Sequence, residues 1–205
     1  MNEYLNARRR MVELIRGEGV KDENVLKALL KVPRHEFVLP EFRELAYSDN
    51  ALPILEGQTI SQPLIVGLMT SLLELKGNER VLEVGTGSGY QAAVLGELCR
   101  EVYSIEIIPK LAERAEQTLK GLGYENVFVT VGDGSKGLKS RAPFDCIMVT
   151  ASARKVPGEL FKQLKEGGIM VLPVGSKLLK VRKIKGSALV ENVAEVAFVP
   201  LVESK

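Results

Sequence analysis

Residues 81–95 read Val81-Leu-Glu-Val-Gly-Thr-Gly-Ser-Gly-Tyr-Gln-Ala-Ala-Val-Leu95, and this stretch decides the fold. The apolar run at 81–84 predicts a buried strand, and the apolar run after Tyr90 predicts a helix. Between the two, Gly85, Gly87 and Gly89 let backbone amides approach a ligand closely, because no Cβ stands in the way. The helix also turns its positive end and its free N–H groups towards this loop. The stretch therefore predicts a ligand site between a strand and a helix.

The spacing of the glycines distinguishes between classes of ligand. A dinucleotide-binding loop reads G-x-G-x-x-G, and its third glycine would fall where this chain has Tyr90. Glu83, two residues before the first glycine, would repel a pyrophosphate and suits a ligand that carries positive charge. The E-x-G-x-G-x-G pattern from Glu83 to Gly89 resembles motif I of class I S-adenosylmethionine (SAM) methyltransferases. A generic glycine-rich turn between a strand and a helix is the alternative.

Composition indicates a soluble, globular protein of one domain. The chain has 205 residues, of which 45% are hydrophobic, and a net charge of +2. This charge gives no strong case for a nucleic-acid surface, and no apolar run reaches the roughly 18 residues of a membrane span. The charged N-terminus is unlike a signal sequence, so we expect a cytoplasmic protein without a nucleic-acid or membrane partner.

The rarer residue types narrow the chemistry further. Cys99 and Cys146 lie in apolar surroundings and match no metal-ligand spacing, so we expect buried, reduced thiols. With one histidine in the chain, neither a zinc site nor a His-based triad has enough members, and no metal is expected. Lys and Glu are abundant while Asp, Asn and Gln are sparse, a bias typical of thermophilic proteins.

The first 75 residues predict a helical cover and an irregular loop. Apolar residues recur at helical spacing in residues 2–31, with an interruption at Gly17 and Gly19, so two short helices are expected. Asp22 is placed to cap the second helix. An irregular segment follows to about residue 60, and residues 63–75 predict an apolar helix.

From residue 80 the pattern changes to an alternation of strands and helices. The expected strands are 81–84, 102–105, 127–131, 144–149 and 169–173, and the expected helices are 90–99, 109–122 and 157–164. Such alternation predicts an α/β fold with a doubly wound, mostly parallel, Rossmann-like sheet. The tail predicts antiparallel strands at 181–184, 189–190 and 195–201. We expect one domain over 1–205, with the helical cover and substrate loop in 1–75 and the cofactor-binding core in 76–205.

Polar residues follow the predicted parallel strands, at the edge where open α/β sheets bind ligands. Glu106, with Ile107 beside it, ends the second strand, where a carboxylate can accept hydrogen bonds from both ribose hydroxyls. Asp133 follows the third strand and could accept the adenine amino group, beside Gly134, which lets the ring approach. Each acid alone also fits a solvated strand end or a plain turn. Together, order and spacing indicate a SAM site made of Glu83, Gly85, Thr86, Gly87, Ser88, Gly89, Glu106, Ile107, Asp133 and Gly134.

The chemistry available at this site favours a carboxylate as the methyl acceptor. Amines and alcohols need a base or a metal at neutral pH, whereas a carboxylate with a pKa of about 4 is already ionised. The fourth strand is followed by Thr150-Ala-Ser-Ala153 and not by the Asn/Asp-Pro-Pro-aromatic motif shared by enzymes that methylate nucleobase amines. Thr59 and Ser61, just before the 63–75 helix, could hydrogen-bond an acceptor carboxylate. A capping role for Ser61 at that helix is equally consistent with the sequence.

Five stretches of the chain are similar to the protein-L-isoaspartate O-methyltransferase family. They are residues 32–38, 46–63, 81–95, 144–151 and 163–168, and the segment Gly57-Gln-Thr-Ile-Ser-Gln-Pro63 is the most specific. The resemblance implies methyl transfer from SAM to the free α-carboxylate of L-isoaspartyl residues in damaged proteins, with S-adenosyl-L-homocysteine as the product. The ester would then close to a succinimide that opens partly to normal aspartate.

The same resemblance implies roles for individual residues. The family's catalytic serine falls at Ser61, and Thr59, Ile60 and Gln62 would line the same pocket. We expect Ser61 to orient the acceptor carboxylate and not to attack it, because no base that could activate the hydroxyl is visible. The glycine loop with Glu83, and the acids Glu106 and Asp133, carry over as cofactor ligands.

Several features keep alternatives open. His35 is expected to be a hydrogen-bonded structural residue, with substrate contact as the alternative. Arg34 could attract an anionic acceptor or brace the N-terminal cover. Residues 198–201 resemble the family's closing strand, whose edge can help to hold a peptide. The alternative functions are a SAM enzyme acting on RNA or a small metabolite, and a non-catalytic SAM-binding module.

Overall fold

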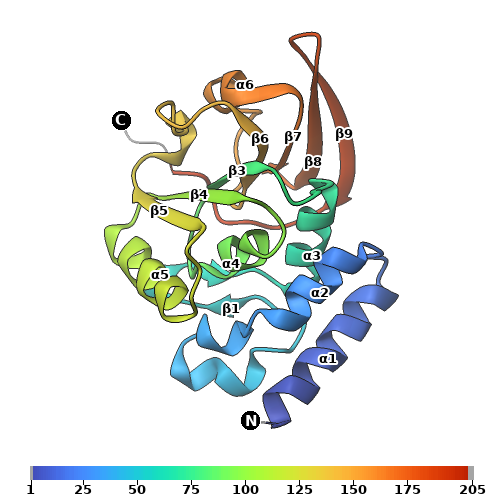
Figure 1. Ribbon diagram of the computed structural model, residues 1–205, viewed down its shortest axis with the longest axis vertical. Helices are drawn as coiled ribbons and strands as arrows, with labels where there is room; N and C mark the ends of the chain where they lie inside the picture. Colours follow the sequence, from blue (N-terminus) through green and yellow to red (C-terminus); the bar gives the residue numbers. More distant parts are fainter. Residues whose placement is uncertain (1, 203–205) are drawn as a thin grey trace.

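The computed structural model describes residues 2–202 and is built around a seven-stranded sheet with the order β5-β4-β3-β6-β7-β8-β9 (Figure 1). The strands from β5 to β7 in this order run parallel, and β8 and β9 extend the sheet antiparallel. The strands are β3 (Arg80–Val84), β4 (Glu101–Glu106), β5 (Val127–Val131), β6 (Phe144–Val149), β7 (Leu164–Val174), β8 (Lys177–Ile184) and β9 (Ser187–Glu195). The predicted fold class, a mostly parallel Rossmann-like sheet with antiparallel C-terminal strands, is confirmed.

Helices connect the parallel strands as the alternation predicts. They are α3 (Pro63–Leu72), α4 (Tyr90–Gly96), α5 (Pro109–Gly121) and α6 (Gly158–Gln163). The first two end three residues earlier than predicted, at positions 72 and 96, and β7 begins five residues earlier, at position 164. Strand order reverses at β3, which lies between β4 and β6, so the carboxyl end of β3 is where a doubly wound sheet binds its ligand.

Alternate residues of each strand supply two separate cores. Val81 and Met148 pack in the larger core, with residues from α1 to α5, whereas Leu82 and Val149 pack in the smaller core with α6 residues such as Leu160. Because successive side chains of a strand point to opposite faces, a parallel sheet covered on both faces needs apolar residues at every position. This explains why the strands read as continuous apolar runs and not as alternating patterns.

The N-terminal cover lies against the larger core. The helices α1 (Asn2–Gly17) and α2 (Glu23–Lys31) pack against α3, and the Asp22 side chain accepts the Asn24 amide at 2.9 Å as the cap of α2, as predicted. The segment predicted to be irregular contains short elements instead. These are η1 (Arg34–Glu36), η2 (Pro40–Leu45), β1 (Leu52–Pro53), η3 (Leu55–Gly57) and β2 (Thr59–Ile60). The strands β1 and β2 pair antiparallel and form a small hairpin.

The predicted strand at 195–201 is wrong. The ninth strand ends at Glu195, and the chain then crosses to the loop that follows β6. There the Ser152 amide donates to the Val199 carbonyl and the Leu201 amide donates to the Ser152 carbonyl, both at 2.8 Å. Pro200 has no amide hydrogen to give to a ladder, so this segment makes only an isolated bridge. The apolar pattern of 198–201 therefore reflects contact with the loop after β6, and not a continuation of the sheet.

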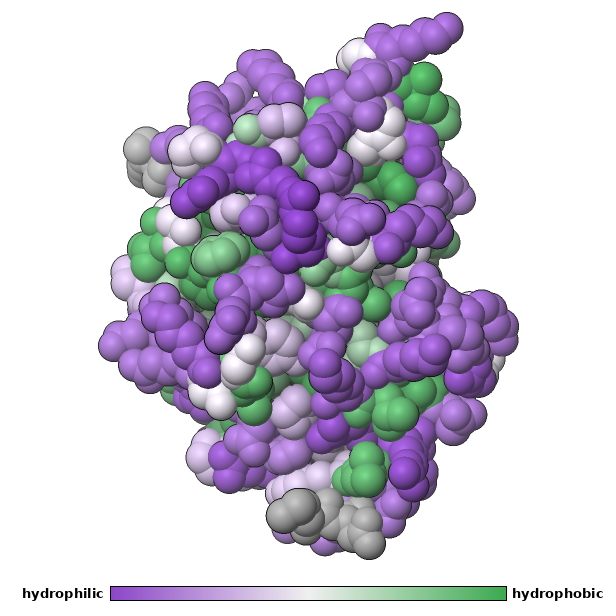
Figure 2. Space-filling view, viewed as in Figure 1, coloured by the Kyte–Doolittle hydropathy of each residue, from purple (hydrophilic) through white to green (hydrophobic). Residues whose placement is uncertain are grey.

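Other expectations concern the surface and the thiols. Figure 2 shows hydrophilic residues over most of one face, with hydrophobic residues in separate patches. Within residues 2–202, no helix combines the length and the apolar composition needed to cross a bilayer. Cys99 and Cys146 are free and buried, as expected, and burial raises the pKa of each thiol to about 12.

Candidate functional site

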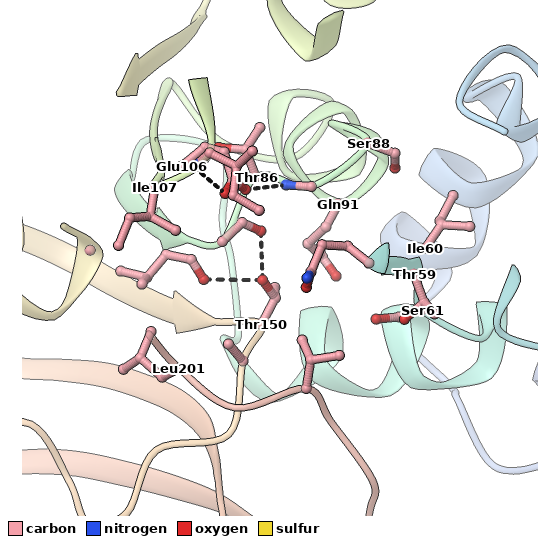
Figure 3. A pocket seen from close by; sticks show the side chains of 18 of the residues that line it. Thr59, Ile60, Ser61, Thr86, Ser88, Gln91, Glu106, Ile107, Thr150 and Leu201 are labelled. Atoms are coloured by element: carbon pink, nitrogen blue, oxygen red, sulfur yellow. Dashed lines mark hydrogen bonds between the residues drawn. The ribbon is translucent and has the colours of Figure 1, made fainter. Parts of the chain in front are cut away.

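A pocket that is partly open to solvent lies at the carboxyl ends of β3, β4 and β6. Its walls come from the β1–β2 hairpin, the glycine loop, the ends of β4 and β6, and the C-terminal segment. Figure 3 shows Glu106 and Ile107 on one side, Thr59, Ile60 and Ser61 on the other, and Thr150 between them. The predicted site residues that line the pocket are Thr59, Ile60, Ser61, Gly85, Thr86, Gly87, Ser88, Glu106, Ile107 and Gly134. The other predicted site residues do not line the pocket; they are Glu83, Gly89, Asp133 and Gln62.

The first glycine of the loop is in close contact with the end of β6. Gly85 has a φ of +98°, and a Cβ there would lie 2.5 Å from the Thr150 hydroxyl oxygen. Thr150 donates that hydroxyl to the Gly85 carbonyl at 2.6 Å (Figure 3). Only a glycine fits, because both the backbone conformation and the neighbouring side chain exclude a larger residue. The sequence predicted small residues after β6, but it did not show that Thr150 fixes the glycine loop.

The second glycine is held by the predicted ribose ligand. The Gly87 amide donates to Oε2 of Glu106 at 2.8 Å, and the Ile108 amide donates to Oε1 at 3.0 Å. These two bonds fix the carboxylate, which is buried but lines the pocket. Each carboxylate oxygen has a second lone pair, so Glu106 can still accept two hydroxyl groups.

Two predicted cofactor residues lie behind the loop and shape it. Gly89 begins α4 with a φ of +88°, and a Cβ there would lie 3.2 Å from Ala115 of α5, so this glycine permits close helix packing. Asp133 caps η4 (Gly134–Lys136) by accepting the Ser135 amide at 3.0 Å, and it pairs with Lys136 at 3.3 Å. A contact between Asp133 and adenine stays a prediction.

Glu83 is fully buried beneath the loop. The Ser104 hydroxyl donates to its Oε2 at 2.5 Å, and Ser104 is also within 2.5 Å of the Thr86 hydroxyl, which lines the pocket. The other oxygen, Oε1, has no hydrogen-bond partner among the described residues. Burial, with a smaller contribution from the charge of Glu106, raises the pKa of Glu83 to about 8, against the lowering effect of the Ser104 hydrogen bond. Glu83 is therefore connected to the pocket through two hydroxyl groups.

Asp49 decides between the two interpretations of Ser61. The helix α3 is capped from Asp49, whose Oδ1 accepts the Leu64 amide at 2.9 Å. Oδ2 of Asp49 accepts the Gln62 side-chain amide at 2.7 Å, which turns Gln62 away from the pocket. Ser61 does not cap α3, and its hydroxyl points into the pocket (Figure 3). It has no hydrogen-bond partner among the described residues, so it is available to a ligand.

Arg34 and His35 lie outside the pocket wall. Arg34 is fully buried and donates to the carbonyls of Ala46 and Ser61, both at 2.8 Å. His35 stacks on Tyr4 with 4.1 Å between ring centroids, and its Nδ1 lies 2.6 Å from the Tyr47 hydroxyl. Burial lowers the pKa of His35. These contacts agree with the expected structural role of His35, and they show that Arg34 braces the loop that carries Ser61.

Sequence reasoning missed part of the pocket wall. Tyr90 and Gln91, at the start of α4, line it, and the Gln91 side chain donates to Thr70 of α3 at 3.0 Å. A polar residue in an otherwise apolar helix start was the available signal for Gln91. Residues 199–202 close the pocket opposite the hairpin, in the segment that resembled a closing strand.

Comparison with known proteins supports the family resemblance that the sequence motifs indicated. A model of the family described as protein-L-isoaspartate(D-aspartate) O-methyltransferase matches residues 6–205. Protein-L-isoaspartate O-methyltransferase of Dictyoglomus turgidum is 52% identical over 202 residues, which covers 97% of this chain and 92% of that protein.

Two solved structures have the same fold as this chain. One named protein-L-isoaspartate O-methyltransferase has a TM-score of 0.86 at 31% identity and covers 94% of this chain, which spans 65% of its length. A Plasmodium falciparum protein, solved in complex with S-adenosyl-L-homocysteine, has the same fold, with a TM-score of 0.85 at 24% identity over 96% of this chain and 99% of that chain. Since the family matches nearly the whole length and the site has the expected glycine loop and serine, the chain belongs to the protein-L-isoaspartate(D-aspartate) O-methyltransferase family.

Proposed function

We propose that this chain transfers the methyl group of SAM to the free α-carboxylate of L-isoaspartyl residues, and that Ser61 orients that carboxylate. Membership of the family supports the reaction. The observation that supports the role of Ser61 is that Asp49 caps α3, which leaves the Ser61 hydroxyl in the pocket without another task. The resulting ester closes to a succinimide, which opens partly to normal aspartate, so the reaction starts a repair.

The residues of the pocket fit SAM. Glu106 is fixed by two backbone amides and can accept the ribose hydroxyls. A Cβ at Gly134 would overlap the Val84 side chain, so this glycine lets the chain pack closely on the end of β3, where it lines the pocket. When bound, SAM supplies a methyl group on a positively charged sulfur. The loop from Gly85 to Gly89 and the neutral, buried Glu83 then hold the cofactor without a phosphate-binding charge.

The acceptor side needs only to bind and desolvate a carboxylate. Thr59 and Ser61 provide hydroxyl groups that can donate to its oxygens, and the apolar side chains of Ile60, Val199 and Leu201 line the same pocket and exclude water. Because a carboxylate is already ionised at neutral pH, its alignment towards the methyl group is the main task that remains.

Ser61 is unsuited to nucleophilic attack. A nucleophilic serine is activated by a base within hydrogen-bonding distance, and no residue within 2–202 hydrogen-bonds the Ser61 hydroxyl. His35, the one histidine, is engaged with Tyr47 and Glu36. The hydroxyl of Ser61 is therefore assigned as a donor to the acceptor carboxylate.

Damaged proteins and peptides that contain L-isoaspartyl residues are the proposed partners, and the cytoplasm is the proposed location. The pocket is partly open to solvent and Ser61 is among its lining residues, so a peptide can reach Ser61. No nucleic-acid or membrane partner is proposed, since a net charge of +2 provides little attraction to either.

The role of Ser61 is tested by Ser61→Ala, with Ser71→Ala as the matched control. Ser71 lies in α3, away from the pocket wall, and donates its hydroxyl to the Gly67 carbonyl of its own helix. We expect Ser61→Ala to lower kcat/KM for an isoaspartyl peptide by about tenfold or more, because a donor to a desolvated carboxylate is lost. Binding of S-adenosyl-L-homocysteine and the activity of Ser71→Ala should stay unchanged. Full activity of Ser61→Ala would show that the serine does not hold the acceptor.

A further inference from the structure

Arg34 is a buried cation that forms no salt bridge among residues 2–202. Its side chain is fully buried, and its hydrogen bonds go to the carbonyls of Ala46, Asn50 and Ser61. Nη1 has no hydrogen-bond partner among residues 2–202. The charge of the nearby acid Asp49 acts on Arg34 without a salt bridge, and both Asp49 carboxylate oxygens accept hydrogen bonds, from Leu64 and Gln62. Buried arginines are usually paired with carboxylates, because an uncompensated charge in the interior is costly.

The position of this charge is directly behind the acceptor wall of the pocket. Nη2 of Arg34 donates to the Ser61 carbonyl at 2.8 Å, and the guanidinium carbon lies 4.8 Å from the centre of the Tyr90 ring. Ser61 and Tyr90 both line the pocket. Although burial lowers the pKa of Arg34 to about 10, the group is a cation at neutral pH.

The pocket wall itself offers no other positive charge to an acceptor. The lining residues within 2–202 include no Lys and no Arg, and the acid among them, Glu106, lies on the opposite side (Figure 3). An acceptor carboxylate that leaves water needs compensation for its charge, and two hydroxyl groups provide only part of it. A buried cation that no carboxylate contacts directly acts over several ångströms, because the protein interior screens its charge less than water does.

We propose that Arg34 supplies the positive charge that selects an ionised carboxylate at the acceptor position, besides holding the loop of Ser61. This makes Arg34 a positioning and specificity residue that acts through the pocket wall without touching the substrate. The inference rests on the proposed function, since it takes the isoaspartyl carboxylate as the anion that enters.

The test compares two peptides that differ only in charge at the acceptor group. One contains an isoaspartyl residue with a free α-carboxylate, and the other has an α-carboxamide at the same position. Both are titrated calorimetrically against the enzyme saturated with S-adenosyl-L-homocysteine, so that no transfer occurs. The variants are Arg34→Gln and Arg34→Lys. Arg8→Gln is the matched control, because Arg8 also donates to backbone carbonyls, at Leu30 and Lys31, but lies in the N-terminal cover.

We expect the unmodified protein and Arg8→Gln to prefer the carboxylate peptide by about tenfold or more in Kd. Arg34→Gln should lose that preference, and Arg34→Lys should keep most of it while it binds both peptides more weakly, since Lys retains the charge but not the forked donor. S-adenosyl-L-homocysteine binding and Tm report whether each variant is folded. If Arg34→Gln does not fold, Arg34→Lys carries the test.

The results distinguish a failure of the inference about Arg34 from a failure of the proposed function. Equal weakening of both peptides in Arg34→Gln, or loss of the preference in Arg34→Lys, would reduce Arg34 to a structural brace. An unchanged preference in Arg34→Gln would overturn the inference as well. Failure of the unmodified protein to bind either peptide would count against the proposed function and not against the role of Arg34 alone.

Discussion

Glu83 has the least ordinary surroundings of any single side chain at this site. Its Oε2 accepts a hydrogen bond from Ser104, its Oε1 has no partner among the described residues, and its pKa is raised to about 8 by burial. The sequence suggested an acid that faces the ligand. The structure instead places a buried carboxyl group below the loop, because the position two residues before Gly85 still belongs to β3 and points to the larger core's side of the sheet, as Val81 does, away from the pocket wall.

The raised pKa of Glu83 predicts a specific dependence of stability on pH. The folded protein keeps a proton that the unfolded chain loses above its ordinary pKa of 4.5, so this contribution is fully present below pH 4.5 and is lost as pH rises towards 8. Glu83→Gln has no proton to lose. We expect its Tm, relative to the unmodified protein, to increase by roughly 2 °C or more between pH 5 and pH 8.5. A constant difference in Tm across this range would contradict the assignment.

Gly85→Ala tests the contact between the glycine loop and Thr150. The new Cβ would lie 2.5 Å from the Thr150 hydroxyl oxygen, so the loop must move. We expect affinity for S-adenosyl-L-homocysteine, measured by calorimetry, to fall about tenfold or more. Gly186→Ala is the control, because Gly186 also has a positive φ, of +73°, but no atom within 4 Å of its Cβ. Equal affinities in both variants would show that the close contact between Gly85 and Thr150 does not matter for cofactor binding.

At the scale of elements, the sequence determined most of the parallel sheet but little of the hairpin and the tail. Continuous apolar runs that alternate with amphipathic helices identify β3, β4, β6 and β7, because these strands are largely buried on both faces. The edge strand β5 also has an apolar sequence, although it is largely exposed. The strands β1 and β2 have two residues each, too few for any periodicity. The cap of α3 comes from Asp49, fifteen residues before the amide of Leu64 that it accepts, so no local signal shows it.

The cap from Asp49 has a functional consequence that an ordinary cap lacks. Asp49→Ala removes the cap of α3 and the hydrogen bond that holds Gln62, the residue next to Ser61. We expect the free energy of unfolding to fall by about 1 kcal/mol and the KM for an isoaspartyl peptide to rise. Asp22→Ala removes a similar cap from α2, away from the pocket, and should cost the same stability without a change in KM. Urea denaturation and steady-state kinetics measure the two effects. An unchanged KM in Asp49→Ala would show that the cap of α3 does not determine the position of Ser61.

At the scale of the whole molecule, topology brings the site together from segments far apart in the chain. The switch of strand order at β3 opens the crevice, the N-terminal cover holds the hairpin beside it, and residues 199–202 close the opposite side (Figure 1). Motif spacing identified most of the predicted cofactor residues that line the pocket, because they lie at consecutive strand ends; their contact with SAM stays a prediction. The acceptor side depends on Arg34, Asp49 and the C-terminal segment. These come close together only in the folded chain, so no single sequence motif predicts their contacts.

The most direct measurement is methyl transfer from labelled SAM to a peptide that contains an L-isoaspartyl residue, with the same peptide containing L-aspartate run alongside. The two peptides have the same atoms and the same net charge, and they differ in which carboxylate is free. We expect base-labile label, as of a methyl ester, on the isoaspartyl peptide alone. Label on both peptides at similar rates, or binding of SAM without transfer to either, would contradict the account.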